Sequence, residues 1–140
     1  MPNDTRRILI VEDNLLNVKM LEAKLRSRRF EVDVALDGRE ALEKFPQGRF
    51  DGVLLDVMLP EIDGFEVCRR LKTHPMAQGV AVVMITALDR PNDREAGFDA
   101  GADEFFVKPV EDEVLFRRLE QLVRAPRPAA GAGGAAAGAT

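Results

Sequence analysis

The sequence predicts a doubly wound α/β domain, with a five-stranded parallel sheet that helices cover on both faces. Three observations predict it. Short apolar runs alternate five times with segments of helical periodicity, the fourth run is uniformly apolar, and polar side chains follow the strands. Alternating strands and helices favour a parallel sheet. Right-handed crossover connections then favour the doubly wound arrangement.

The first half of the chain contains three expected strands and two expected helices. The strands are residues 8–11, 32–35 and 53–55, which are rich in Val, Leu and Ile. The first helix is indicated by apolar residues at helical spacing: Leu15, Val18, Leu21 and Leu25. The apolar face of the second helix consists of Gly38, Ala41, Leu42 and Phe45. Pro46 and Gly48 are expected to stop this helix, because both residues are poor helix formers.

The second half continues the alternation after a turn at residues 60–64. A third helix has an apolar face of Phe65, Cys68 and Leu71, and residues 80–85 form a uniformly apolar strand, as expected at the centre of a parallel sheet. The fourth helix, near residues 91–100, is polar and has few apolar anchors, Ala96 and Phe98. A fifth strand at residues 105–107 follows. The face of the last helix consists of Leu115, Leu119, Leu122 and Val123.

The composition favours one globular domain followed by a tail. We expect the domain to span residues 1–124 and the tail to span residues 125–140, which are rich in Ala, Gly and Pro. The net charge of −4 argues against direct nucleic-acid binding, which needs a basic face. With a single cysteine, no intramolecular disulfide can form. Neither a signal peptide nor a membrane span is recognisable, so we expect a cytoplasmic protein without membrane contacts.

Polar side chains follow the expected strands at their carboxyl ends. They are Glu12 and Asp13 after the first strand, Asp56 after the third, Thr86 after the fourth and Lys108 after the fifth. Ligands of open parallel sheets bind beyond the carboxyl ends of the strands, where the strand order reverses. We therefore expect three acids, a hydroxyl and an amine to meet at one edge of the sheet.

Crowded carboxylates indicate a site for a hard divalent cation. Acids this close together repel one another, so at least one pKa should rise unless a cation is bound. Mg²⁺ suits a site of one or two carboxylates with several waters. Asp13 and Asp56 are the expected direct ligands, and Glu12 is long enough to act through water. A carboxylate can also be a phosphoryl nucleophile, with Lys108 and the Thr86 hydroxyl binding the transferred group.

Four sequence segments carry a resemblance to a known family. ILIVEDN, LLDVMLPEIDG, VVMITA and FFVKP resemble the successive signatures of bacterial two-component receiver domains, and the likeness covers about residues 6–124. LLEAKL, ALDG and DGFEVCRRLK are also similar to the first receiver of PleD-type regulators. The resemblance implies a flavodoxin-like (βα)5 fold with strand order 2-1-3-4-5.

The resemblance also implies a role for each site residue. Asp56 corresponds to the aspartate that accepts a phosphoryl group from a histidine kinase in a Mg²⁺-dependent reaction. Met58 corresponds to the residue whose backbone carbonyl is a metal ligand. Thr86 and Phe105 correspond to the switch pair that remodels a partner-binding face formed by the fourth helix, the fifth strand and the fifth helix. Lys108 corresponds to the lysine that precedes a commonly cis proline.

A receiver of this kind is not an enzyme with a separate substrate, since it catalyses only its own phosphorylation and dephosphorylation. Its implied partners are a sensor histidine kinase or phosphotransfer protein, an output protein or domain, and a second copy of the chain in a homodimer. The apolar side chains of Met58 and Leu88 should flank the approach of water to the acyl phosphate, which predicts slow hydrolysis.

Each residue also has a simpler interpretation when it is taken alone. Asp13 or Asn14 could be the N-cap of the first helix, and Thr86 could be an ordinary β-former. Cys68 is expected to be a small core residue, and His74 an exposed loop residue. The simpler interpretations fail together, because the polar groups all lie at the same edge of the same expected sheet.

Other functional classes stay open as alternatives. A phosphatase of the haloacid-dehalogenase type also uses an aspartyl nucleophile and Mg²⁺, but places it after the first strand in a D-x-D pattern. Here that strand ends in Glu12, Asp13 and Asn14. A phosphorylation-independent adaptor would be indicated by loss of an acid or of Lys108. A flavin or nucleotide binder would need a glycine-rich or hydroxyl-rich phosphate loop.

Overall fold

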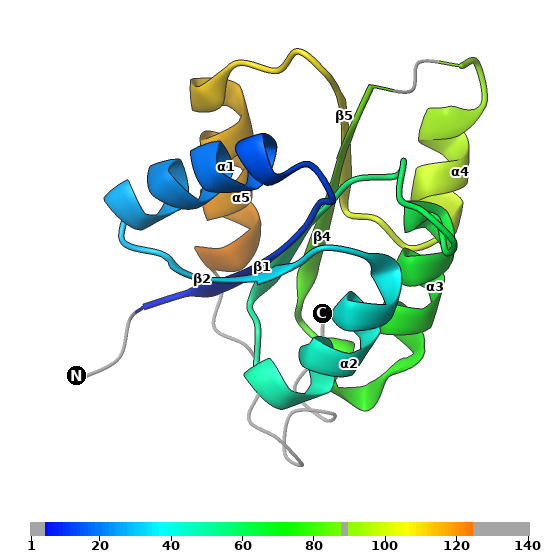
Figure 1. The fold of residues 1–140 in the computed structure, drawn as a ribbon, viewed down its shortest axis with the longest axis horizontal. Coiled ribbons are helices and arrows are strands. Elements are labelled where there is room, and N and C mark those ends of the chain that lie inside the picture. The colour runs from blue at the N-terminus through cyan, green and yellow to red at the C-terminus, as the bar shows by residue number, and fades with distance from the viewer. Residues whose placement is uncertain (1–4, 88–89, 125–140) are drawn as a thin grey trace.

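The computed structural model describes residues 5–87 and 90–124, which form a five-stranded parallel sheet between two layers of helices (Figure 1). The strands are β1 (Arg7–Val11), β2 (Glu31–Ala35), β3 (Gly52–Leu55), β4 (Ala81–Thr86) and β5 (Glu104–Val107). The helices are α1 (Leu15–Ser27), α2 (Gly38–Gly48), α3 (Gly64–Thr73), the short 3₁₀ helix η1 (Pro75–Ala77), α4 (Asp93–Asp99) and α5 (Asp112–Arg124). The tail predicted for residues 125–140 lies outside the described residues.

The strand order is β2-β1-β3-β4-β5 with every pairing parallel, which confirms the predicted topology. The order reverses at β1, so the carboxyl ends of β1 and β3 flank the point where ligands of such sheets bind. Val11 pairs with Leu55 in the register of these two strands. The residues that follow, Glu12 and Asp56, therefore leave the sheet at the same level.

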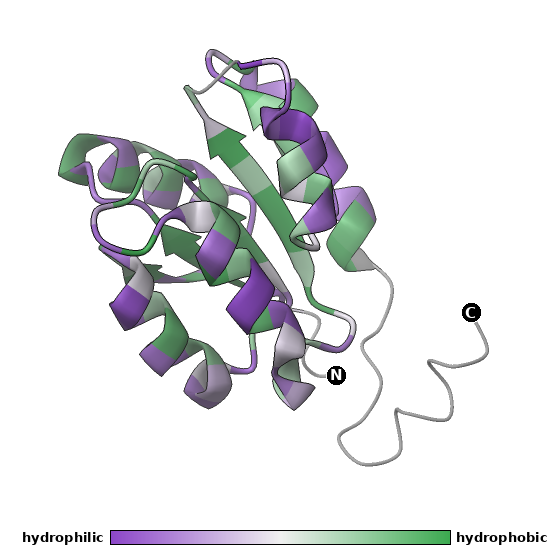
Figure 2. Ribbon diagram, turned by 90° about the vertical axis from the view of Figure 1, so that its right-hand side faces the viewer, coloured by the Kyte–Doolittle hydropathy of each residue, from purple (hydrophilic) through white to green (hydrophobic). Residues whose placement is uncertain are grey.

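The two faces of the sheet carry separate apolar cores. Helices α2, α3 and α4 cover one face, and α1 and α5 cover the other (Figure 1). The largest fully buried side chains of the first core are Leu9, Phe45, Phe50, Leu55, Leu71, Met84 and Phe105. Those of the second are Ile8, Ile10, Leu25, Leu54 and Phe116. Figure 2 shows mainly hydrophobic strands between helices that carry both polar and apolar residues. Strands β3 and β4 are buried along their whole length, as expected where both faces of a sheet are covered, whereas β2 includes the polar residues Glu31 and Asp33.

Side-chain oxygens cap the N-termini of three described helices. Asn14 accepts a hydrogen bond from the Asn17 amide at the start of α1, over 3.0 Å. Asp37 and Asp63 do the same at the starts of α2 and α3. Such caps satisfy backbone amides that have no partner within the helix. The cap of α1 is thus Asn14, which leaves the neighbouring Asp13 carboxylate outside the capping interaction.

Helix α2 continues through Pro46, so the prediction that Pro46 stops it was wrong. The helix runs on to Gly48, and Arg49 follows in the left-handed region with φ of 52°. A proline in the last turn removes only one backbone hydrogen bond. Burial of the Phe45 ring, stacked on Phe50 with 6.3 Å between ring centroids, holds this turn in place.

The inner face of α4 is made of small residues, which the sequence pattern did not predict. Gly97 and Ala100 are buried, whereas the predicted anchor Phe98 is 42% exposed and Ala96 is half-buried. A helix can pack closely through backbone and methyl groups, and such a contact leaves no trace in a hydrophobic pattern. The prediction for Phe98 was therefore wrong.

His74 links α3 to the short helix η1 and is half-buried, which corrects its expected exposed position. Its Nδ1 accepts a hydrogen bond from the Met76 amide over 3.0 Å, and its ring lies edge-on to Phe45 with 6.2 Å between centroids. His74 is thus a structural cap. None of the described helices has both the length and the apolar composition needed to cross a bilayer.

Candidate functional site

The carboxyl end of β1 carries two of the predicted acids. The backbone amide of Glu12 donates to the Ala35 carbonyl over 3.1 Å, which extends the pairing of β1 with β2 by one residue. The Glu12 side chain is buried, and its Oε2 accepts from the Asn14 amide over 3.1 Å. Asp13 is exposed. One acid is thus fixed inside the edge of the sheet, and the other faces solvent beside it.

Asp56 follows β3 and is only 8% exposed. Its backbone amide donates to the Val11 carbonyl over 3.0 Å, and its Oδ1 accepts from the Met58 amide over the same distance. The loop behind it is closed by the Gly64 amide, which donates to the Val57 carbonyl over 2.8 Å. Main-chain hydrogen bonds on both sides thus fix the orientation of this carboxylate.

Lys108 brings a positive charge between two of these acids. Its Nζ lies 3.5 Å from Glu12 Oε1 and 3.6 Å from Asp56 Oδ2. Its backbone amide donates to the Thr86 carbonyl over 2.8 Å, and the Lys108–Pro109 peptide bond is cis. Thr86 is the last residue of β4 and is fully buried. The predicted lysine and hydroxyl residue therefore both lie at the edge that carries the acids.

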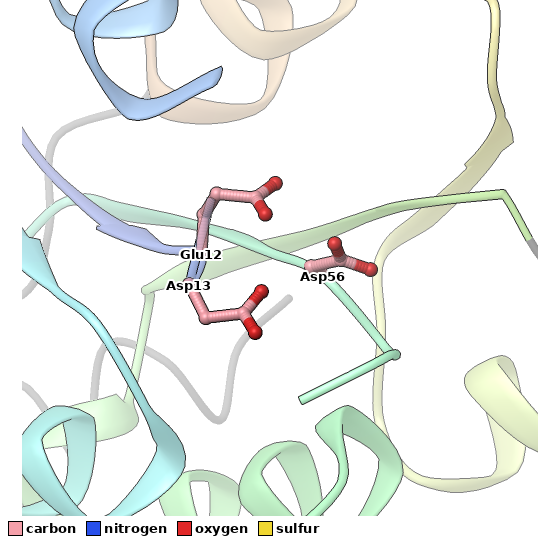
Figure 3. Close-up of side chains that lie close together, drawn as sticks. All are labelled: Glu12, Asp13 and Asp56. Atoms are coloured by element: carbon pink, nitrogen blue, oxygen red, sulfur yellow. The ribbon is translucent and has the colours of Figure 1, made fainter. Parts of the chain in front are cut away.

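The three acids form a cluster that fits a divalent cation. Glu12, Asp13 and Asp56 each offer a carboxylate oxygen, and these oxygens lie within 4.8 Å of one another. Figure 3 shows the side chains of Glu12 and Asp13 leaving β1 and extending toward the side where Asp56 follows β3. Carboxylate oxygens are the protein ligands that Mg²⁺ prefers, and the crowding of negative charge favours binding of a cation. The residues present therefore fit Mg²⁺.

Burial raises the pKa of the Glu12 carboxyl above its ordinary value, and the negative charge of Asp56 acts in the same direction. The hydrogen bond from the Asn14 amide and the charge of Lys108 oppose this rise without cancelling it. Burial contributes more to this rise than the crowding of the acids does. A cation bound beside Glu12 would favour the charged form of its carboxyl.

A cavity of about 540 Å³ opens beside the acids, between α1 and the segment that joins β5 to α5. Glu12, Asp56 and Lys108 line one end of it. Its other lining is mainly apolar and includes Met20, Leu21, Pro109, Val110 and Leu115. Three of the polar groups of the site thus border a hollow whose other walls are mainly apolar.

Phe105 lies on β5 at a distance from the acids, and its side chain is 1% exposed. It pairs in register with Met84, two residues before Thr86 on β4. Alternate residues of a strand share a face of the sheet, so Met84 and Thr86 point to the same side. The predicted switch aromatic therefore belongs to the core beneath α4.

Met58 contributes its backbone amide to the site, as described for Asp56, while its side chain is 52% exposed. Its predicted role as a carbonyl ligand of the metal stays a prediction. Leu88, predicted to flank the approach of water together with Met58, lies outside the described residues.

Sequence reasoning missed the main-chain donors at the site. The amides of Asn14 and Met58 hold the carboxylates of Glu12 and Asp56, and both lie two residues after the acid that they bind. For Asp56 this is the spacing of an Asx-turn, in which an Asp or Asn side chain binds the backbone two residues on, so the aspartate itself was a signal for the Met58 contact. The contact of Glu12 with the Asn14 amide had no such signal.

Comparison with known proteins identifies the family. The profile of the response regulator receiver domain matches residues 8–120. The chain is 48% identical to the response regulator PleD of Caulobacter vibrioides over 118 residues, which is 84% of this chain and 26% of PleD. It is 41% identical over 131 residues to the response regulator MprA of Mycolicibacterium vanbaalenii, covering 94% of this chain and 56% of MprA. The chain thus spans between a quarter and just over half of these curated relatives.

Solved structures agree with this assignment. The BeF3-activated N-terminal receiver domain of RstA from Klebsiella pneumoniae has a TM-score of 0.80 and 30% identity, covering 86% of this chain and all of that one. The receiver domain of a sensor histidine kinase from Pseudomonas aeruginosa, with magnesium coordinated in its active-site cleft, has a TM-score of 0.79 and 31% identity. That match covers 86% of this chain and 99% of the other. The chain therefore belongs to the response-regulator receiver domains of two-component systems.

Proposed function

We propose that Asp56 accepts a phosphoryl group from the phosphohistidine of a sensor histidine kinase or phosphotransfer protein. The observation that carries the proposal is the position of the Asp56 carboxylate. It is held by the Met58 amide through one oxygen, and its other oxygen lies 3.6 Å from the Lys108 ammonium, at the end of an open cavity. A fixed carboxylate beside a cation is suited to nucleophilic attack on phosphorus.

In the proposed step, an Asp56 carboxylate oxygen forms a bond to phosphorus as the bond between phosphorus and the donor imidazole nitrogen breaks. The electron pair of the broken bond stays on that nitrogen. The other ring nitrogen carries a proton already or takes one up from water, so the donor leaves as neutral histidine. The Lys108 ammonium lies where it can bind an oxygen of the transferred group. Thr86 follows on the adjacent strand and supplies a hydroxyl. The main-chain donors keep Asp56 oriented throughout.

Glu12, Asp13 and Asp56, with the Met58 carbonyl, are the residues that would hold Mg²⁺. When bound, the ion would neutralise the charge of the acids and of the phosphoryl oxygens. Dependence on Mg²⁺ is supported by the clustering of three carboxylates, of which only Glu12 and Asp56 have an ammonium, that of Lys108, within 4 Å among the described residues. Without a divalent cation, an incoming phosphoryl group would meet net negative charge.

Phosphorylation is proposed to act on the face formed by α4, β5 and α5 through Thr86 and Phe105. Movement of the Thr86 hydroxyl toward the acyl phosphate would change the space available beside Met84 and Phe105 on the same side of the sheet. A ligand shifts an equilibrium between two packings by its differential affinity for them. The output partner, an output domain or a second copy of the chain would bind the altered face. Family membership supports a cytoplasmic location.

Intact-mass spectrometry after incubation with acetyl phosphate tests the phosphoacceptor. We expect one phosphate adduct in the presence of Mg²⁺, none with EDTA and none in Asp56→Asn. Asp37→Asn is the matched control, because Asp37 caps α2 and is not one of the three clustered acids, and asparagine keeps the capping oxygen. A folded protein that binds Mg²⁺ and forms no adduct, either with acetyl phosphate or with a phosphorylated kinase, would favour a constitutive adaptor. Continuous release of phosphate from small esters would favour a phosphatase.

A further inference from the structure

Helix α4 touches the Phe105 ring through a residue that has no side chain. A Cβ atom added at Gly97 would lie 2.6 Å from Cδ2 and 3.1 Å from Cε2 of Phe105, and 3.1 Å from Met84 Sδ. Real Cβ atoms essentially never approach a neighbour to within 3.0 Å. The ring edge and the Met84 sulfur thus occupy the space that any side chain at residue 97 would need.

A second residue of α4 lies over the same ring. The guanidinium carbon of Arg94 is 5.6 Å from the centroid of Phe105, within the range of a cation–π interaction. Residues three apart share a face of a helix, so Arg94 and Gly97 approach the ring from one side of α4. Phe105 is therefore enclosed by Met84 of the sheet below and by these two positions of α4.

Few other contacts fix α4 to the sheet. The helix has seven residues, and only Asp93 and Gly97 are buried within it, with Ala100 buried at its end. Asp93 is engaged at the start of the helix, where its carboxylate binds the Arg90 guanidinium at 3.0 Å. The close approach at Gly97 is thus the main contact between the middle of α4 and β5.

We propose that Gly97 is a positioning residue for Phe105. Because it has no side chain, α4 can lie close enough to β5 for the ring to stay buried, and this packing sets the state of the face formed by α4, β5 and α5. A side chain at residue 97 displaces the ring from its place beside Met84 and weakens the response of that face to phosphorylation. The claim about the response to phosphorylation rests on the proposed function, whereas the claim about the packing of Phe105 does not.

A double-mutant cycle tests the packing. Intrinsic helix propensity alone predicts that Gly97→Ala stabilises α4, whereas the contact with Phe105 predicts that it destabilises the protein. We expect Gly97→Ala to lower the midpoint of urea unfolding, and to do so less or not at all in a Phe105→Leu background. Asp99→Ala is the control, because it raises helix propensity at an exposed position of the same helix and should show no coupling to residue 105. Equal effects of Gly97→Ala in both backgrounds would overturn the proposal.

Nuclear Overhauser effects between the Phe105 ring protons and the Met84 methyl group report the position of the ring. They should be present in the parent protein and in Asp99→Ala, and lost or strongly reduced in Gly97→Ala. If they persist in Gly97→Ala, the helix has moved while the ring has stayed, and Gly97 does not position Phe105.

The effect of residue 97 on the response to phosphorylation is measured separately. Under acetyl phosphate and Mg²⁺, Gly97→Ala should form the phosphate adduct at a rate within twofold of the parent. Its phosphorylation-induced amide shifts along α4 and β5 should fall by at least half. Undiminished shifts would overturn the regulatory role while leaving the packing result intact. Absence of the adduct in the parent as well, with acetyl phosphate and with a phosphorylated kinase, would refute the proposed function, and would leave the unfolding cycle and the Overhauser measurement as independent tests of Gly97.

Discussion

The Lys108 ammonium lies 3.6 Å from the Asp56 carboxylate, and the two residues follow different strands, β5 and β3. The same ammonium is 3.5 Å from Glu12. A single flexible side chain thus serves two acids at once. It supplies the one cation within salt-bridge distance of them among the described residues.

Replacement of Lys108 should therefore slow phosphorylation. Lys108→Met keeps the apolar stem and removes the charge, so we expect adduct formation from acetyl phosphate to slow on the order of 100-fold, as when one positioned donor to a transition state is removed. The rate follows from intact mass at timed quenches. Lys72→Met is the control, because Lys72 pairs with Asp103 at 3.2 Å instead of with the site acids. Equal rates in the two variants would contradict the role of Lys108.

Mg²⁺ should stabilise the protein through the three acids. A ligand present at one hundred times its Kd raises the free energy of unfolding by about 3 kcal/mol. In Asp13→Asn we expect roughly 30-fold weaker binding, which leaves below about 1 kcal/mol at the same Mg²⁺ concentration. Urea unfolding with MgCl₂ or EDTA measures the stabilisation by Mg²⁺ in the parent and in Asp13→Asn. NaCl at equal ionic strength controls for screening, and a Mg²⁺ effect of unchanged size in Asp13→Asn would refute the predicted ligand set.

Gly64 should tolerate no side chain, because a Cβ there would overlap the Asp56 carbonyl oxygen and Val57 Cα, which are backbone atoms. We expect Gly64→Ala to lower the free energy of unfolding by about 3 kcal/mol and to slow phosphorylation by displacing the loop that holds Asp56. Gly52→Ala is the contrast. Its nearest neighbours are side-chain ends, Ile8 Cδ1 at 3.0 Å and Val123 Cγ1 at 3.1 Å. Gly52→Ala should lower the free energy of unfolding by no more than about 1 kcal/mol. Equal costs would show that the loop adjusts freely.

Stability should fall at alkaline pH through Cys68. Burial raises the pKa of this fully buried thiol from its ordinary 9.0 to about 11. The unfolded chain loses the thiol proton first, so stability is unaffected by this group below pH 9 and falls by up to about 3 kcal/mol as the pH rises to 11. Lysines titrate in the same range, so the comparison is with Cys68→Ala. That variant starts less stable and should lose less stability between pH 8 and 11. Parallel pH curves would exclude the thiol as the cause.

The lifetime of the acyl phosphate should depend on Met58, whose side chain is 52% exposed next to Asp56. An apolar thioether cannot orient an attacking water, whereas an amide can. We expect Met58→Asn to hydrolyse the phosphorylated protein several-fold faster, as measured by decay of the adduct after the phosphodonor is removed. Met58→Leu should behave like the parent. Equal decay in the Asn and Leu variants would remove Met58 from the hydrolytic step.

The sheet and most of the site could be predicted because both follow from local patterns. Apolar runs placed the strands to within one residue at each end, as for β4, expected at 80–85 and found at Ala81–Thr86. Parallel strands then bring the residues after β1, β3 and β5 to one edge. The acid cluster could therefore be predicted from the positions of the strand ends alone.

The packing of α4 could not be predicted in the same way. Its inner face is a glycine, and its largest apolar residue, Phe98, is exposed. Hydrophobic periodicity detects side chains that are buried, and has no signal for a helix that packs through its own backbone. The contact of the Asn14 amide with Glu12 had no sequence signal either, because it depends on loop conformation, whereas the Asx-turn at Asp56 could have been anticipated.

Glu12 and Lys108 are far apart in the sequence, since Glu12 follows the first strand and Lys108 follows the last. A copy of the chain that ends before β5 would contain all three acids but would lack the ammonium that lies within 3.6 Å of Glu12 and Asp56. If Asp56 is the phosphoacceptor proposed above, such a truncated copy should accept a phosphoryl group far more slowly than copies that include Lys108.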